Sequence, residues 1–150
     1  MAWGLTNSAG DWADLIAVEL SDDHYKTASG LKPLEIEREL IDVQGGETVV
    51  LDVRRTQWGP LFTMNGENYA YRWLAHQPEA LNAFEFMSLD QVATTGEAIS
   101  TAQRTGISPF NILAADASVD IAWTLAGHLP KRGAVPTERV VPWQQVEDTW

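Results

Sequence analysis

Two carboxylates near the N-terminus are the residues whose spacing best suits a chemical role. Asp11 and Asp14 lie three positions apart in residues 7–14, among small residues that let backbone carbonyls turn inward. A hard cation such as calcium takes oxygen ligands of this mixed origin around an irregular turn. Two carboxylates alone are too few for a site, and their spacing is not that of an EF-hand. The same residues could instead cap turns before a strand, and the spacing leaves both interpretations open.

No other residue type in the sequence indicates a particular reaction. The three histidines, His24, His76 and His128, lie far apart, so a metal site or a triad would need two of them to converge by folding. The chain contains no P-loop, G-x-G-x-x-G, H-E-x-x-H or G-x-S-x-G motif. It has no cysteine, which removes thiolate nucleophiles and disulfides. The common cofactor signatures are therefore absent.

Charge and length limit the classes of partner. The chain has 150 residues, a formal charge of −11 and 45% hydrophobic positions, which predicts one globular region over residues 1–150. Such a charge repels phosphate backbones, so nucleic acid and anionic membranes are excluded as expected partners. No window approaches the roughly 18 consecutive apolar residues of a spanning helix. We also expect no targeting signal within the chain.

The strands that must position these residues are predicted from alternation and turn signals. Residues 34–43 alternate between apolar and polar side chains, and residues 48–54 return as the second arm of a hairpin across Gly45-Gly46. Shorter strands are predicted at 14–20, 61–63 and 69–74. Two apolar runs, 110–115 and 121–125, form a second hairpin around residues 116–120. The prolines of residues 130–142 predict an extended loop.

One or two helices are predicted between Pro78 and Gln103. Pro78 suits a first helical turn, where its missing amide hydrogen loses no partner. A second helix is predicted to begin after Ser88 as its cap, with Leu89, Ile99 and other apolar residues on one side. The expected fold class is α+β, with a mostly antiparallel sheet.

Five collinear segments resemble the penicillin acylase (penicillin amidase) family of N-terminal-nucleophile hydrolases. The first is Ala-Trp-Gly-Leu-Thr-Asn at residues 2–7, followed by the two aspartates. The others are Arg-Thr-Gln-Trp-Gly-Pro at 55–60, Tyr-Ala-Tyr-Arg-Trp at 69–73, Asn-Ile-Leu-Ala-Ala-Asp at 111–116 and Gly-His-Leu-Pro-Lys-Arg at 127–132. Two segments depart from the family pattern: its H-G-P is Trp-Gly-Pro here, and its D-x-x-G-N turn at residues 116–120 lacks the glycine.

The resemblance implies a secreted or periplasmic precursor that cleaves itself and exposes a serine at the new N-terminus of its β-subunit. That serine attacks an amide carbonyl with its own α-amine as base, and an acyl-enzyme forms. The family fold is a four-layered αββα core, of which this chain resembles an internal piece. We expect the nucleophile to precede Met1 and a second oxyanion donor, an asparagine side chain, to follow Trp150. The isolated chain should then be inactive.

The family's site residues transfer to matching positions of this chain. The resemblance implies that the backbone N–H of Asn7 is one oxyanion donor, since an amide hydrogen survives side-chain variation. It implies calcium ligation by the carboxylates of Asp11 and Asp14 and the carbonyl of Ala13. The acyl-pocket positions are apolar, as an acyl chain or aryl ring demands, although ordinary core packing would explain them as well. They are Leu5, Met87 and Phe110.

Two functions follow from these observations. The first is part of an amide hydrolase, whose partners are the rest of its α- and β-subunits and a small-molecule amide. The alternative is a non-catalytic acidic α+β module that docks onto a protein partner through edge strands and exposed tryptophans. Self-association of the chain is a further possibility, because seven tryptophans need packing partners.

Overall fold

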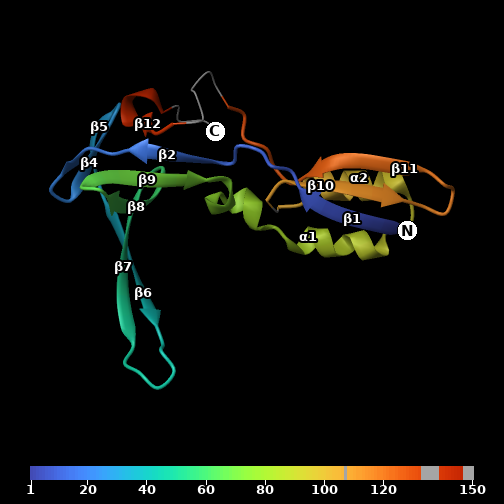
Figure 1. The fold of residues 1–150 in the computed structure, drawn as a ribbon, viewed down its shortest axis with the longest axis horizontal. Coiled ribbons are helices and arrows are strands. Elements are labelled where there is room, and N and C mark those ends of the chain that lie inside the picture. The colour runs from blue at the N-terminus through green and yellow to red at the C-terminus, as the bar shows by residue number, and fades with distance from the viewer. Residues whose placement is uncertain (107, 133–138, 147–150) are drawn as a thin grey trace. The chain divides into compact units, whose positions relative to one another are not determined.

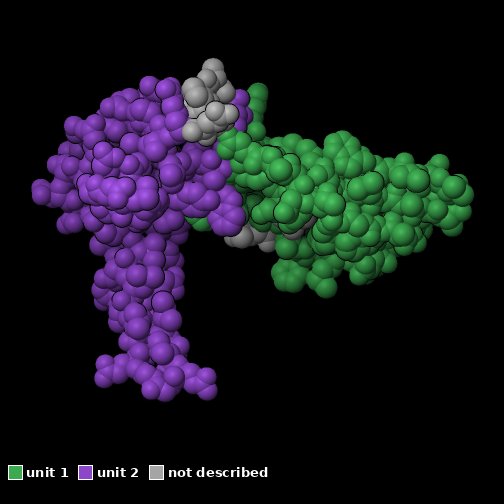
Figure 2. Space-filling view, in the orientation of Figure 1, with its two compact units in different colours: residues 1–12, 74–131 green, residues 13–73, 132–150 purple. Residues whose placement is uncertain are grey.

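The chain is described by a computed structural model covering residues 1–106, 108–132 and 139–146. Its contacts divide into two compact units, Met1–Trp12 with Leu74–Lys131 and Ala13–Trp73 with Arg132–Trp150 (Figure 2). Each unit has its own cluster of buried apolar residues. The physical reason is that residues 13–73 form enough strands to bury apolar side chains among themselves.

The first unit is a three-stranded antiparallel sheet with helices against it (Figure 1). Its strands lie in the order β1-β10-β11. They are β1 (Ala2–Asn7), β10 (Phe110–Ala115) and β11 (Ile121–Ala126). The α-helices are α1 (Phe84–Met87) and α2 (Thr95–Arg104), and the 3₁₀ turns are η1 (Leu74–His76), η2 (Pro78–Leu81) and η3 (Ser88–Gln91).

In the part of this unit that the structure describes, one face of the sheet is covered by helices. Ile112 and Ala114 of β10 are buried with Ala98 and Ala102 of α2 in one cluster. Side chains alternate between the two faces of a strand, so the residues between them lie on the other face. There Leu113 is 47% exposed and Trp123 is 59% exposed. Among the described residues of this unit, the second face of the sheet therefore exposes apolar side chains.

The main helix begins later than the sequence predicts. Ser88 starts the 3₁₀ turn η3 and is the C-cap of α1, so it does not cap the start of a helix, and Val92 after η3 is extended. The cap of α2 is Thr94, whose side chain accepts a hydrogen bond from the Glu97 amide while Glu97 reaches back to the Thr94 amide. This reciprocal capping box satisfies two amides at once, so it outcompetes the single hydroxyl of Ser88. Pro78 does open a helical turn, but a short 3₁₀ one.

The second unit is built from strands. A six-stranded sheet has the order β12-β2-β9-β8-β7-β6, and β3, β4 and β5 form a separate three-stranded sheet. Every pair is antiparallel except β12 with β2. The elements are β2 (Ala13–Ala17), β3 (Leu20–Ser21), β4 (His24–Thr27), β5 (Gly30–Pro33), β6 (Glu35–Ile41), β7 (Val49–Thr56), β8 (Gly59–Met64), β9 (Glu67–Trp73), β12 (Val141–Pro142) and the 3₁₀ turn η4 (Trp143–Gln145).

The Gly45-Gly46 hairpin forms as predicted. It extends beyond the rest of its unit, and its strands pair from Glu35 opposite Arg55 to Ile41 opposite Val49 (Figure 1). Gly45 takes a φ of +75°, which is a conformation that glycine adopts without strain. The aliphatic side chains near its tip are exposed.

The fold class is α+β, with a mostly antiparallel sheet and two α-helices, as the sequence predicts. The hairpin of residues 116–120 is also present, between β10 and β11. The predicted extended loop at 130–142 falls partly on residues 133–138, which lie outside the described residues. Among the helices of the described ranges, none has the length and apolarity needed to cross a membrane.

Candidate functional site

Asn7 ends an edge strand. It is the last residue of β1, lies opposite Phe110 in the register with β10, and is exposed. Among the described strands, β1 pairs with β10 alone. Amides along such a strand alternate between the partner strand and the open side, so an edge strand presents N–H groups that the sheet does not use.

Side chains hold the backbone where β1 ends. The Asn111 side-chain amide donates to the Asn7 carbonyl, with Nδ2 and O 3.0 Å apart. The Ser8 hydroxyl donates to the Pro109 carbonyl over 2.6 Å. Trp123 Nε1 donates to Asn111 Oδ1 over 3.1 Å. The sequence singled out Asn111 only as part of a family segment, and these contacts between distant residues had no local signal.

Two of the three predicted acyl-pocket residues lie together at this end of the sheet. Leu5 is opposite Ile112, so it shares a face with Asn7 and is a diagonal neighbour of Phe110. The same face carries Trp3, whose ring meets Phe86 of α1 edge-on with centroids 5.4 Å apart. The short helix α1 therefore packs against Trp3 on this face of the sheet.

The three acyl-pocket positions are not ordinary core within this chain. Leu5 is 38% exposed and Met87, the last residue of α1, is 68% exposed. Phe110 is half-buried. Apolar side chains left exposed at the end of a sheet are available to an apolar ligand or to another part of the protein.

An arginine contacts two of the three predicted calcium ligands. Arg132 Nη1 lies 2.9 Å from Asp14 Oδ1, and Arg132 Nη2 donates to the Ala13 carbonyl over 3.4 Å. The side chains of this ion pair are only 20% and 11% exposed. Arg72 of β9 lies opposite Asp14 in the register and is itself buried. Asp14 therefore already faces a cation supplied by the protein.

This arrangement does not fit calcium bound by the oxygens as they stand. A guanidinium that donates to a carboxylate and a carbonyl occupies the lone pairs that a metal would use, and its charge repels a divalent ion. Across the described ranges, no group of three or more histidine or acidic side chains could hold a metal. Asp14 is the second residue of β2, so it does not cap a turn before the strand either. Asp11, the third predicted ligand, belongs to the first unit, whereas Ala13 and Asp14 belong to the second.

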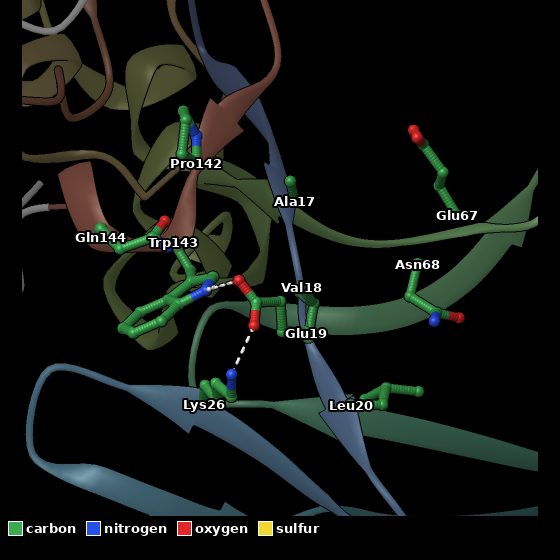
Figure 3. Close-up of a pocket in the computed structure, with 10 residues that line it drawn as sticks. All are labelled: Ala17, Val18, Glu19, Leu20, Lys26, Glu67, Asn68, Pro142, Trp143 and Gln144. Atoms are coloured by element: carbon green, nitrogen blue, oxygen red, sulfur yellow. Dashed lines mark hydrogen bonds and ion pairs between the residues drawn. The ribbon is translucent and has the colours of Figure 1, made fainter.

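The second unit contains a cavity of about 520 Å³ (Figure 3). Its described lining residues do not include the predicted acyl-pocket positions. Its central carboxylate, Glu19, receives Lys26 Nζ at 2.6 Å and Trp143 Nε1 at 3.1 Å. These bonds, with that of Lys26 foremost, lower the pKa of Glu19. Both oxygens of Glu19 already have partners, so the cavity offers no free catalytic carboxylate there.

Comparisons with known proteins bear on the family and the fold. The family model described as penicillin amidase matches residues 1–150. A thermostable penicillin G acylase from Alcaligenes faecalis has a similar structure, with a TM-score of 0.81 at 21% identity over 94% of this chain. The chain spans 27% of that acylase chain. No curated protein sequence matches. Since the family model covers every residue of the sequence, this chain belongs to the penicillin amidase family.

Proposed function

We propose that this chain is part of a hydrolase that cleaves a linear amide through an acyl-enzyme on an N-terminal serine outside the chain. Its own contribution is the backbone N–H of Asn7, donated to the carbonyl oxygen that becomes negative during attack. The observation that supports this role best is the position of Asn7 at the end of an edge strand, with its carbonyl fixed by Asn111. A donor held in place before the reaction needs no reorganisation when charge develops.

The chemistry assigns the remaining steps to groups elsewhere. The serine hydroxyl attacks the amide carbonyl, its own α-amine takes the proton and passes it to the leaving nitrogen, and the amine departs as the acyl-enzyme forms. Water then releases the acid. A serine inside a chain has no free amine, and Ser8, which lies nearest to Asn7 in sequence, donates its hydroxyl to Pro109. We therefore place the nucleophile outside this chain.

The acyl group of the substrate would contact the apolar side chains beside Asn7. Leu5 and Phe110 share the face and the end of the sheet with Asn7, and Met87 lies on the adjoining helix α1. An acyl chain or aryl ring held there would bring its carbonyl to the end of β1. We propose these three as substrate-binding residues.

Other parts of the enzyme would cover the open sheet face. Leu113 and Trp123 are exposed on it, and a sheet with one apolar face normally packs against a second layer. We propose that the remaining parts of the α- and β-subunits supply that layer in a secreted or periplasmic enzyme. The resemblance implies calcium ligation by Asp11, Ala13 and Asp14, but Arg132 already contacts Asp14 and the Ala13 carbonyl, so the proposed reaction includes no step through the ion.

A proline at residue 7 of the complete enzyme tests the central role. Asn7→Pro removes the N–H, and the residue before a proline favours the extended backbone that Thr6 already has in β1. Loss of one oxyanion donor should lower kcat by roughly 10²- to 10³-fold. Asn7→Ala keeps the N–H and serves as the matched control, with kcat close to that of the parent. Equal kcat in the two folded variants, with matching melting temperatures, would refute the role of the amide.

The alternative, a non-catalytic interaction module, gives a different result in the same system. If the complete protein does not hydrolyse penicillin G or a chromogenic amide, the hydrolase proposal fails. The open apolar face would then be explained by a protein partner alone. The isolated chain should be inactive under both functions, so it serves as the blank.

A further inference from the structure

Asn111 links the two strands on either side of it in the first sheet. It lies on the central strand β10, opposite Thr6 of β1 and opposite Leu125 of β11. Its side chain donates to the Asn7 carbonyl and accepts from the Trp123 indole, at 3.0 Å and 3.1 Å. Trp123 is its diagonal neighbour on β11, on the open face of the sheet. One side chain thus connects the end of β1 to the far strand.

The indole fixes which way the Asn111 amide points. An indole Nε1–H can only donate, so the side-chain atom that it contacts must be the amide oxygen. The –NH₂ group of Asn111 is then directed to Asn7, whose carbonyl can only accept. The two contacts are consistent with a single amide orientation. In the flipped orientation the –NH₂ group would face the indole N–H, and the amide oxygen would face the Asn7 carbonyl. The orientation is therefore set by chemistry on both sides.

The last residue of an edge strand needs side-chain hydrogen bonds of this kind to keep its backbone in place. Strand ends open locally at low cost, since they have few neighbours and exposed backbone bonds. Asn111 holds Asn7 after its Cα, because the Asn7 carbonyl belongs to the following peptide. The Ser8 hydroxyl adds a second hold, to Pro109 at 2.6 Å. Ala9 then takes a left-handed φ of +41°, where the chain turns away.

We propose that Asn111, oriented by Trp123, is a positioning residue that keeps the Asn7 amide aimed at the oxyanion. The inference rests on the proposed function, since it gives Asn111 a role through Asn7. Asn111 does not touch the substrate in this scheme. It limits the freedom of the Asn7 backbone, and an error of about 1 Å in a catalytic group costs on the order of 10²-fold in rate.

Two variants of the complete enzyme remove the donor in different ways. Asn111→Leu removes it without adding charge, and Asn111→Asp replaces it with a carboxylate that still accepts from Trp123. We expect kcat to fall by roughly 10²-fold in both at neutral pH while KM stays unchanged. A protonated carboxyl can donate to the Asn7 carbonyl, so kcat of Asn111→Asp relative to the parent should recover as the pH falls. Asn111→Leu should show no such recovery.

The matched control is Asn65→Asp, the same chemical change at an exposed turn of the second unit. It should leave kcat and its pH profile as in the parent. Melting temperatures measured alongside separate misfolding from mispositioning, because a purely structural role would not produce a pH-dependent recovery in one variant only. Trp123→Phe, which removes the orienting N–H, should lower kcat by less than Asn111→Leu does.

The outcomes distinguish the inference from the function on which it rests. No amide hydrolysis by the parent enzyme would overturn the proposed function itself. An active parent with unchanged kcat in folded Asn111→Leu would overturn only the positioning role. A fall in kcat that is equal in Asn111→Asp and Asn111→Leu at every pH would also overturn it, since donation to Asn7 would then be irrelevant.

Discussion

The ion pair of Arg132 with Asp14 should stabilise the second unit more than any exposed pair of the same type. Its two side chains are 20% and 11% exposed, and Arg132 also donates to the Ala13 carbonyl. Exposed pairs contribute at most about 1 kcal/mol, whereas leaving a fully buried charge unpaired costs about 3–5 kcal/mol. The burial of this pair lies between these cases. We expect Arg132→Gln to lower the free energy of unfolding by about 2 kcal/mol.

The chain offers a matched control in Arg38. It contacts Asp52 through Nε at 2.7 Å and Nη2 at 2.8 Å, but these side chains are 65% and 45% exposed. Arg38→Gln should therefore cost less than about 1 kcal/mol despite its two good bonds. Urea denaturation followed by circular dichroism measures both variants. Equal losses would refute the argument that burial decides the contribution.

Calcium provides the second half of this test. In the parent chain the guanidinium already contacts Asp14 and Ala13, so adding calcium or a chelator should leave the melting temperature unchanged. In Arg132→Gln the same oxygens lose that cation, and a ligand that binds only the folded state raises stability. Calcium should then restore part of the loss. A melting temperature of the parent that rises with calcium as much as that of the variant would show that Arg132 does not exclude the ion.

The remaining predictions concern two glycines and the capping box at the start of α2. Gly59→Ala should destabilise the second unit by about 3 kcal/mol in urea denaturation. The φ of Gly59 is +143°, and an added Cβ would lie 2.1 Å from the Tyr71 carbonyl oxygen. Gly66→Ala, at a φ of +83° with open space around it, should cost only about 1 kcal/mol. Thr94→Ala should cost about 1 kcal/mol by removing the cap of α2. The Ala93 and Thr94 amides lower the pKa of Glu97 from its ordinary 4.5, so the stability due to this carboxylate is present above that pH and lost as the pH falls further. A melting temperature of Glu97→Gln that shows the same acid dependence as the parent would contradict this assignment.

The elements that the sequence predicts well are those specified by local signals. The Gly45-Gly46 hairpin and the hairpin of residues 116–120 each join two runs of strand-forming residues through a turn, so pattern and turn agree. The predicted start of the second helix is wrong, because Thr94 and not Ser88 is the N-cap of α2. The Thr94-x-x-Glu97 box is a stronger signal, and it was present in the sequence.

The missing glycine of the 116–120 turn shows what local patterns leave out. Val119 occupies a left-handed φ of +68°, which is strained for a β-branched residue. Asp116 holds the turn instead, because its carboxylate accepts from the Ser118 amide at 2.8 Å and from the Thr95 amide at 3.1 Å. The bond from the Thr95 amide is the main cause of the lowered pKa of Asp116. The bond from the Thr95 amide joins the turn to the start of α2, and no local rule predicts it.

The candidate site depends still more on contacts between distant residues. Arg132 and Asp14 are 118 positions apart, and Asn111 and Asn7 are 104 apart. Sequence spacing places Asp14 near Asp11 and suggests a metal, whereas the fold brings an arginine to it. The resemblance located Asn7, but only the sheet topology shows that it ends an edge strand.

An oxyanion donor and a stable sheet place opposite demands on the same strand. A backbone amide can donate to a substrate only if the sheet leaves it unused, and such amides occur along an edge, which also frays and invites unwanted pairing. In this chain the edge strand β1 ends at Asn7, and side-chain bonds from Asn111 and Ser8 hold the backbone where the strand ends. Neither bond uses the Asn7 N–H, which under the proposed function donates to the ligand. An edge strand secured by neighbouring side chains can therefore be both rigid and available, which is what preorganised stabilisation of a transient negative charge requires.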